Sequence, residues 1–106
     1  MLRRAEIYQI SELLVWAIGD PGAPPRGTPD PDILLWCESQ GFALVTNNRR
    51  SMPVHLAEHL AAGRHITGIF IIHPDMGIGQ MADDLTLIAY ASFESEFADR
   101  ITFLPL

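Results

Sequence analysis

The sequence is short of cysteine, of basic side chains and of long apolar runs, and each shortage excludes a class of protein. Cys37 is the only cysteine, so no intramolecular disulfide and no cysteine-based zinc site can form. Lysine and arginine together number seven, and the formal net charge is -6. A protein that binds nucleic acid through phosphate contacts is normally basic. A nucleic-acid role would therefore need a local basic patch, a metal ion or a partner protein.

No stretch of the chain approaches the roughly 18 apolar residues that cross a bilayer. The first residues, MLRRAEIYQ, are charged and lack the apolar run of a signal peptide. We therefore expect a cytoplasmic protein with no membrane partner. The length of 106 residues and the hydrophobic content of 48% predict a single globular domain.

Short apolar runs alternate with helical patterns along the chain. The predicted strands cover residues 13–18, 42–46, 69–72 and 101–104, and the predicted helices cover 33–40, 52–62 and 78–91. This alternation predicts an α/β fold with a mostly parallel sheet and helices on both faces. Ligands of such sheets bind beyond the carboxyl ends of the strands.

A proline-rich segment precedes the first predicted helix. Residues 19–31 (GDPGAPPRGTPDP) contain five of the eight prolines and three of the eight glycines. This composition excludes a helix or a central strand and predicts a long surface loop. We expect Asp30 at the N-cap of the helix that follows, Pro31 at its first position and Gly41 at its end.

The segment DPDILLWCESQGFALVTNN, from Asp30 to Asn48, carries the strongest functional signal. It resembles the PIN domains of VapC-type toxin ribonucleases. In those domains an acidic residue opens a helix, and a glycine, an apolar strand ending in Val-Thr and an asparagine follow. Asp30 matches the acidic residue, Gly41 the glycine, Val45 and Thr46 the strand end, and Asn48 the asparagine. The resemblance covers positions 12–106 and implies a PIN-like three-layer fold.

The resemblance also implies a chemistry and a partner. Carboxylates at the strand ends of such domains hold Mg²⁺ or Mn²⁺, and the metal activates the water that cuts an RNA phosphodiester. On this basis Asp30, Thr46 and Asn48 are the candidate catalytic residues, and Asp30 and Asp32 are the candidate metal ligands. Proteins of this kind are frequently encoded beside a small helix-turn-helix antitoxin, so the implied partner is an antitoxin protein.

The chain departs from the family pattern in two places. PIN domains begin with a strand that carries a metal-binding aspartate, followed by a helix. This chain begins at what looks like the end of that helix, MLRRAE, so the domain is expected to be N-terminally incomplete. Asn47 and Asn48 are neutral where related sequences often have an aspartate. We therefore expect an impaired site that binds Mg²⁺ weakly and cuts RNA slowly or not at all.

The same residues also have structural interpretations. Aspartate is a favoured N-cap, which accounts for Asp30, and a carboxylate in the first turn such as Asp32 favours the helix dipole. Thr46, Asn47 and Asn48 are ordinary turn residues. The alternative function is therefore a non-catalytic PIN-like binding or oligomerisation module. A third hypothesis is an unrelated flavodoxin-like domain.

Two further patterns follow the predicted strand at 42–46. Arg49 and Arg50 could contact an RNA phosphate backbone, and a solvated surface is the alternative. The RNA contact is the favoured interpretation, because two of only seven basic residues lie at this edge. His55, Glu58 and His59 match the H-x-x-E-H zinc signature on a helix. An accidental match is the favoured interpretation, because the downstream glutamate that such zinc enzymes need has no candidate.

These patterns predict a geometry and an assembly. The carboxyl ends of the strands at 13–18 and 42–46 are expected to lie side by side, which would bring Asp30 near Asn47 and Asn48. A sheet without its first strand has an unprotected edge. We therefore expect a homo-oligomer or a partner protein to cover that edge.

Overall fold

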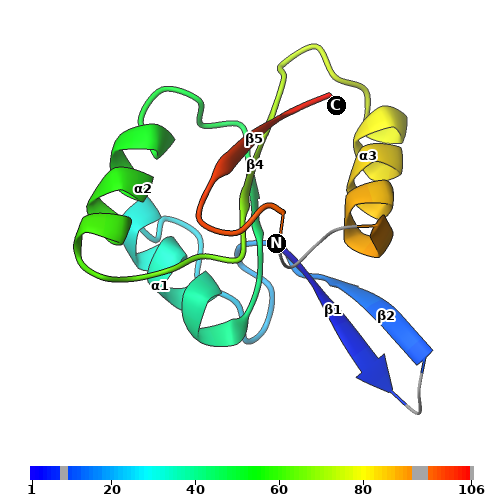
Figure 1. Ribbon diagram of the computed structural model, residues 1–106, viewed down its shortest axis with the longest axis horizontal. Helices are drawn as coiled ribbons and strands as arrows, with labels where there is room; N and C mark the ends of the chain where they lie inside the picture. Colours follow the sequence, from blue (N-terminus) through cyan, green and yellow to red (C-terminus); the bar gives the residue numbers. More distant parts are fainter. Residues whose placement is uncertain (8–9, 92–95, 106) are drawn as a thin grey trace.

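The computed structural model describes residues 1–7, 10–91 and 96–105 (Figure 1). Two strands come first, and helices then alternate with strands. The elements are β1 (Leu2–Ile7), β2 (Ile10–Val15), α1 (Asp30–Gln40), β3 (Leu44–Thr46), α2 (Met52–Ala61), β4 (Ile69–Ile72), α3 (Ile78–Ala91) and β5 (Ile101–Leu104). Within these residues, no helix has the length and apolar character needed to cross a membrane.

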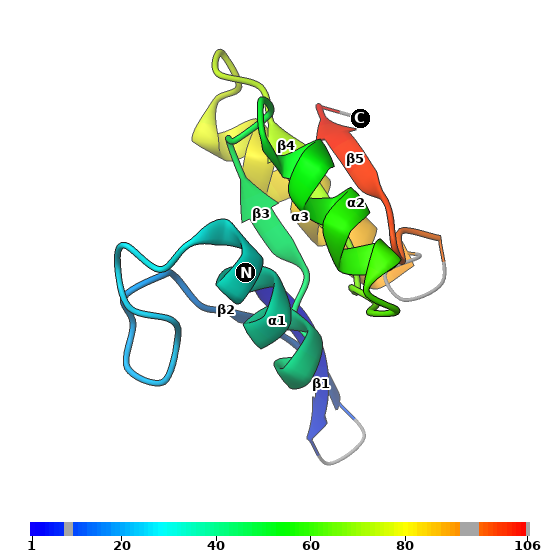
Figure 2. The same cartoon turned by 90° about the vertical axis from the view of Figure 1, so that its left-hand side faces the viewer.

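Three parallel strands form the central sheet, in the order β3-β4-β5. β3 pairs with β4 from Leu44 opposite Ile69 to Thr46 opposite Ile71, and β5 lies on the other side of β4. α1 and α2 cover one face of the sheet, and α3 covers the other (Figure 1, Figure 2). The prediction of an α/β fold with a parallel sheet and helices on both faces is confirmed.

The amino-terminal residues differ from the prediction. The sequence predicts a strand over 13–18 in the parallel sheet and the end of a helix at MLRRAE, and both predictions are wrong. β1 and β2 instead form an antiparallel hairpin of their own, with Leu2 opposite Val15 and Ile7 opposite Ile10. The hairpin projects away from the three layers (Figure 1, Figure 2). An apolar run is compatible with a strand in either sheet, and pairing with the neighbouring segment closes a shorter loop.

The start of α1 differs from the prediction by one residue. Pro29 occupies the N-cap in an extended conformation (φ -61°, ψ 147°), so Asp30 is the first helical residue and not the cap. The reason is that the carbonyl of Pro29 already accepts hydrogen bonds from the backbone N–H groups of Asp32 and Ile33. Gly41 ends the helix with φ 74°, as predicted, in the left-handed region that glycine adopts without strain.

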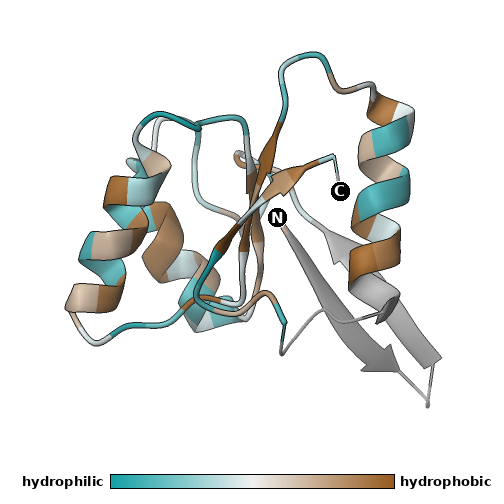
Figure 3. Ribbon diagram, turned by 45° about the horizontal axis from the view of Figure 1, so that its top comes forward, coloured by the Kyte–Doolittle hydropathy of each residue, from teal (hydrophilic) through white to brown (hydrophobic). Residues whose placement is uncertain are grey.

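The hydrophobic core is divided between the two faces of the sheet. Ile69 and Ile71 of β4 belong to the cluster that includes Leu34 of α1, whereas Phe70 belongs to the cluster that includes Ile88 of α3. This alternation follows from the two-residue period of a strand. Figure 3 shows the hydrophobic strands at the centre of the molecule. Burial on both faces explains why these strands are continuously apolar in sequence.

An aromatic cluster connects the end of the hairpin to the central layers. The ring of Phe42 lies 5.2 Å from the ring of Trp16 and 5.2 Å from that of Trp36, measured between centroids. Trp16 follows β2, Trp36 lies on α1, and Phe42 precedes β3. Offset aromatic pairs at such distances are favourable. This cluster therefore packs the residue after the hairpin against α1 and the start of β3.

Candidate functional site

Four polar residues meet at the carboxyl end of β3. Asp30 begins α1, Thr46 ends β3, Asn48 lies in the following turn, and Ser51 directly precedes α2. Nδ2 of Asn48 donates a hydrogen bond to Oδ2 of Asp30 at 2.7 Å. The prediction that Asp30 lies near Asn48 is confirmed, but this proximity arises from α1 and β3. In the described residues β3 is hydrogen-bonded to β4, and the strand β2 that overlaps 13–18 is hydrogen-bonded to β1 in a separate sheet.

Asn48 is the centre of this cluster. Its Nδ2 also donates to Oγ of Ser51 at 2.7 Å, and its Oδ1 accepts a hydrogen bond from the backbone N of Ser51 at 3.2 Å. Its backbone N donates to Oγ1 of Thr46 at 3.1 Å. The reversed amide would turn Oδ1 toward the carboxylate of Asp30, so these contacts fix the orientation of the side chain. Asn48 thus connects the starts of both helices to the end of β3.

The other residues of the turn are exposed. Asn47 makes no side-chain hydrogen bond within the described residues, and its carbonyl accepts the backbone N–H of Arg49. Arg49 and Arg50 are exposed, and none of the ion pairs in the described part of the chain involves them. Their guanidinium groups face no carboxylate partner there and can approach a phosphate.

His55 belongs to the same cluster, although the sequence pattern placed it only in a zinc signature. Its Nε2 lies 4.0 Å from Oδ2 of Asp30, and its side chain is 25% exposed. Its Nδ1 is buried and has no hydrogen-bond partner among the described residues. The position of His55 in the first turn of α2, which begins beside Asn48, is the sequence signal that could have placed it here.

The donor set around Asp30 does not fit the cation that the resemblance implies. Magnesium and manganese bind through several oxygen ligands, whereas Asn48 turns N–H groups toward Asp30. Asp32 is exposed and takes part in none of the side-chain contacts present in the described residues. Among residues 1–7, 10–91 and 96–105, no group of three His, Cys, Asp or Glu side chains is placed to hold a metal.

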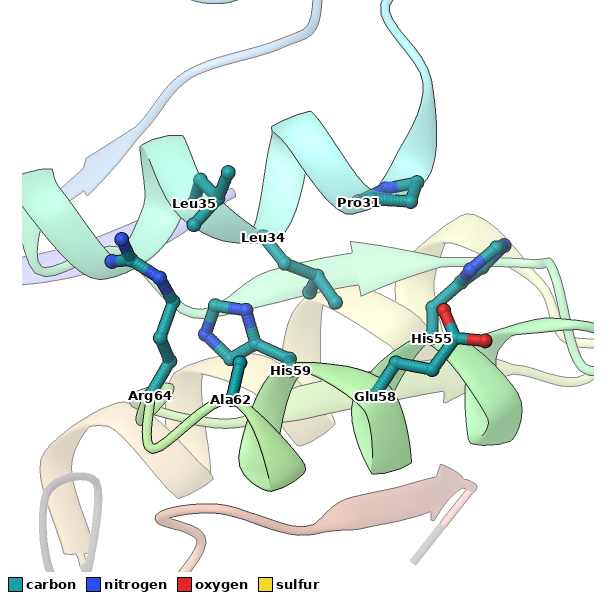
Figure 4. A pocket seen from close by; sticks show the side chains of 8 residues that line it. All are labelled: Pro31, Leu34, Leu35, His55, Glu58, His59, Ala62 and Arg64. Carbon is teal, nitrogen blue, oxygen red and sulfur yellow. The ribbon is translucent and has the colours of Figure 1, made fainter.

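A groove of about 230 Å³ separates α1 from α2 (Figure 4). It is lined by Pro31, Leu34, Leu35, His55, Glu58, His59, Ala62 and Arg64. The H-x-x-E-H residues therefore share one groove, but the two histidines approach different carboxylates of α1. His55 faces Asp30, and Nε2 of His59 lies 2.8 Å from Oε1 of Glu38. This arrangement gives no support to a shared zinc ion.

A second polar network connects the carboxyl ends of α1 and α2. Nε2 of His59 forms a hydrogen bond with the carbonyl oxygen of His65 at 3.0 Å and lies 2.8 Å from Oε1 of Glu38. Glu38 also accepts the backbone N–H of His65 at 3.1 Å. Nδ1 of His65 donates to Oδ2 of Asp99 at 2.8 Å, and Oδ1 of Asp99 accepts the backbone N–H of Ile66 at 2.8 Å. The network thus reaches from α1 to the segment that leads into β5.

Replacement of Asn48 by alanine removes the donor to Asp30 and the acceptor for the N–H of Ser51. We expect the free energy of unfolding to fall by about 1–3 kcal/mol, because partly buried polar groups lose their partners. Urea unfolding followed by tryptophan fluorescence measures this. Asn47→Ala is the matched control and should cost less than about 0.5 kcal/mol. Equal losses in the two variants would contradict the central place given to Asn48.

Asp99 should make stability depend on pH. The N–H of Ile66, and then His65, lower the pKa of its carboxyl. Its stabilising effect is therefore present above pH about 4 and is lost as the pH falls through the lowered pKa. Asp99 has φ 59°, which asparagine also tolerates.

We therefore expect Asp99→Asn to lower stability at neutral pH by less than about 1 kcal/mol, since the side chain is 36% exposed and solvent screens its charge. The difference from the unmodified chain should disappear in acid. Urea unfolding at a series of pH values measures it. A difference that stays constant across the series would show that the charge of Asp99 is unimportant.

Comparisons with protein-family models, with curated proteins and with solved structures find no match. The sequence pattern and the geometry of the cluster are the remaining indications of function. Both direct attention to Asp30 and Asn48 at the carboxyl end of β3.

Proposed function

We propose that this chain is a PIN-like domain of the toxin–antitoxin kind whose metal-dependent endoribonuclease site is impaired. The observation that carries the proposal is the 2.7 Å hydrogen bond between Asn48 and Asp30 at the carboxyl end of β3. In the family pattern, an acidic residue at the start of a helix lies beside the carboxyl end of a strand. Here α1 supplies one acid, and the turn after β3 supplies an amide. A single acid holds a divalent cation poorly, which is why we propose that the site is impaired.

An RNA ligand is supported by the two arginines beside this cluster. Arg49 and Arg50 are exposed and lie immediately before Ser51, the N-cap of α2. Basic side chains and the positive end of a helix dipole both favour a phosphate group. The net charge of -6 disfavours broad contact with a polyanion. The proposed RNA contact is therefore confined to this edge of the sheet.

The alternative is a non-catalytic binding or oligomerisation module, and the strand edges favour it. β3 and β5 each have one neighbour in the central sheet, as do β1 and β2 in the hairpin. Phe103 of β5 is 54% exposed. Unpaired strand edges promote pairing with another chain. The proposed partners are an antitoxin protein and a second copy of this chain, meeting in the cytoplasm.

Cleavage of a mixed RNA pool with Mg²⁺ or Mn²⁺ tests the impaired site. We expect the unmodified chain to cut RNA slowly or not at all, because one carboxylate holds such a cation poorly. Asp30→Asn should then change little, as should the control Asp32→Asn on the same helical turn. Robust metal-dependent cleavage that Asp30→Asn abolishes and Asp32→Asn retains would contradict the proposal.

RNA binding at different salt concentrations tests the ligand. Replacement of Arg49 and Arg50 by glutamine should weaken binding and reduce the salt dependence by about one unit of slope per lost phosphate contact. Arg26→Gln, in the exposed loop before α1, is the matched control. Affinity that is unchanged in the double variant would favour the oligomerisation module.

A further inference from the structure

The carboxylate of Asp30 faces two side-chain nitrogen atoms. Its side chain is 30% exposed, and a charge that is largely removed from water needs partners. Nδ2 of Asn48 lies 2.7 Å from Oδ2 of Asp30, and Nε2 of His55 lies 4.0 Å from the same oxygen. We infer that the amide of Asn48 and the imidazole of His55 together take the place of a divalent cation at Asp30. On this inference, Asn48→Asp alone converts the cluster into a cation site.

The amide of Asn48 cannot serve a cation without breaking its own contacts. A cation on Asp30 would require an oxygen of residue 48 to face it. In the observed orientation Oδ1 accepts the N–H of Ser51, and Nδ2 donates to Asp30 and to Oγ of Ser51. Reversal of the amide would lose all these hydrogen bonds and would place Oδ1 against a carboxylate oxygen. The side-chain amide of Asn48 therefore has all its hydrogen-bond partners without an ion.

The ring of His55 is also suited to donate and not to ligate. A metal bound through Nε2 leaves the ring proton on Nδ1, and metal-bound histidines normally donate that proton to an oxygen. Nδ1 of His55 is buried and has no such partner in the described residues. The other tautomer places the proton on Nε2, which faces Asp30. The Nε2–H tautomer avoids a buried N–H without an acceptor at Nδ1 and turns its proton toward Asp30 at 4.0 Å, so we assign this tautomer to His55.

Aspartate at position 48 has nearly the same shape as asparagine but carries no N–H groups. It would bring two carboxylates into contact, and their like charges would repel each other. A divalent cation removes this repulsion, and Oγ of Ser51 offers a further oxygen. The stability of Asn48→Asp would then depend on the cation. This inference concerns the groups that surround the carboxylate of Asp30 and does not depend on RNA binding or on a toxin role.

Thermal unfolding of the full chain in EDTA and in Mn²⁺, without RNA, tests the inference. Asn47→Asp is the matched control, because it makes the same charge change one residue away at an exposed side chain. The unmodified chain and Asn47→Asp should shift by less than about 2 °C, whereas the Tm of Asn48→Asp should rise by roughly 10 °C when Mn²⁺ is about a hundred times its dissociation constant. The inference is overturned by an equally large shift in the unmodified chain, or by no shift in Asn48→Asp.

A measurement on the unmodified chain covers the case in which Asn48→Asp does not fold. Long-range ¹H–¹⁵N NMR distinguishes the two tautomers of a histidine ring. We expect His55 to carry its proton on Nε2, and we expect the signals of His55 and Asn48 to persist when Mn²⁺ is added. A proton on Nδ1, or selective broadening of both residues by Mn²⁺, would overturn the inference. Because no RNA is present, a negative result in these measurements overturns only the inference about Asp30. The proposed function is tested separately by RNA cleavage and RNA binding.

Discussion

The hydrogen bond between the side-chain amide of Asn48 and the carboxylate of Asp30 holds together the elements that meet at the carboxyl end of β3. Asn48 follows β3, Asp30 begins α1, and Ser51 directly precedes α2, so one amide connects three elements. The other atoms of that amide are satisfied by Ser51. A buried polar group is stabilising when all its partners are present and costly when one is missing. The edge therefore depends on the identity of residue 48.

At both ends of the layer formed by α1 and α2, a carboxylate of α1 contacts polar groups of α2 or of the turns beside it. Asp30 near the start of α1 faces Asn48 and His55, and Glu38 near its end faces His59 and the backbone of His65. Between these polar contacts lies the groove lined partly by leucine side chains of α1 (Figure 4). Asp30 and Glu38 thus receive their partners from α2 and its flanking turns. A shift of α1 along α2 would break both sets of contacts together.

Local sequence signals were sufficient to predict most of the strands and helices of the central layers. The spacing of apolar residues predicts the strands β3, β4 and β5 and the three helices, and Gly41 marks the end of α1 as expected. The proximity of Asp30 and Asn48 was predictable because a helix that leads back into a strand starts where that strand ends. The start of α1 was missed by one residue, because proline at position 29 provides the N-cap without a side-chain hydrogen bond.

Two features depend on non-local contacts and were missed. The apolar run at 13–18 fits a strand in any sheet, and its sequence does not reveal that residues 10–15 pair with β1. The orientation of His55 toward Asp30 depends on how α2 is rotated against α1. The H-x-x-E-H spacing shows only that His55 and His59 share a helical face, and it cannot show that each faces a different carboxylate.

The central claim is that the amide of Asn48, and not a metal ion, occupies the position beside Asp30. The most direct test is a crystal structure of the unmodified chain grown with Mn²⁺, with diffraction recorded near the manganese absorption edge. The account predicts no anomalous peak beside Asp30 and a distance close to 2.7 Å between Nδ2 of Asn48 and Oδ2 of Asp30. An anomalous peak between Asp30 and Asn48, with the amide reversed so that Oδ1 faces the ion, would contradict it.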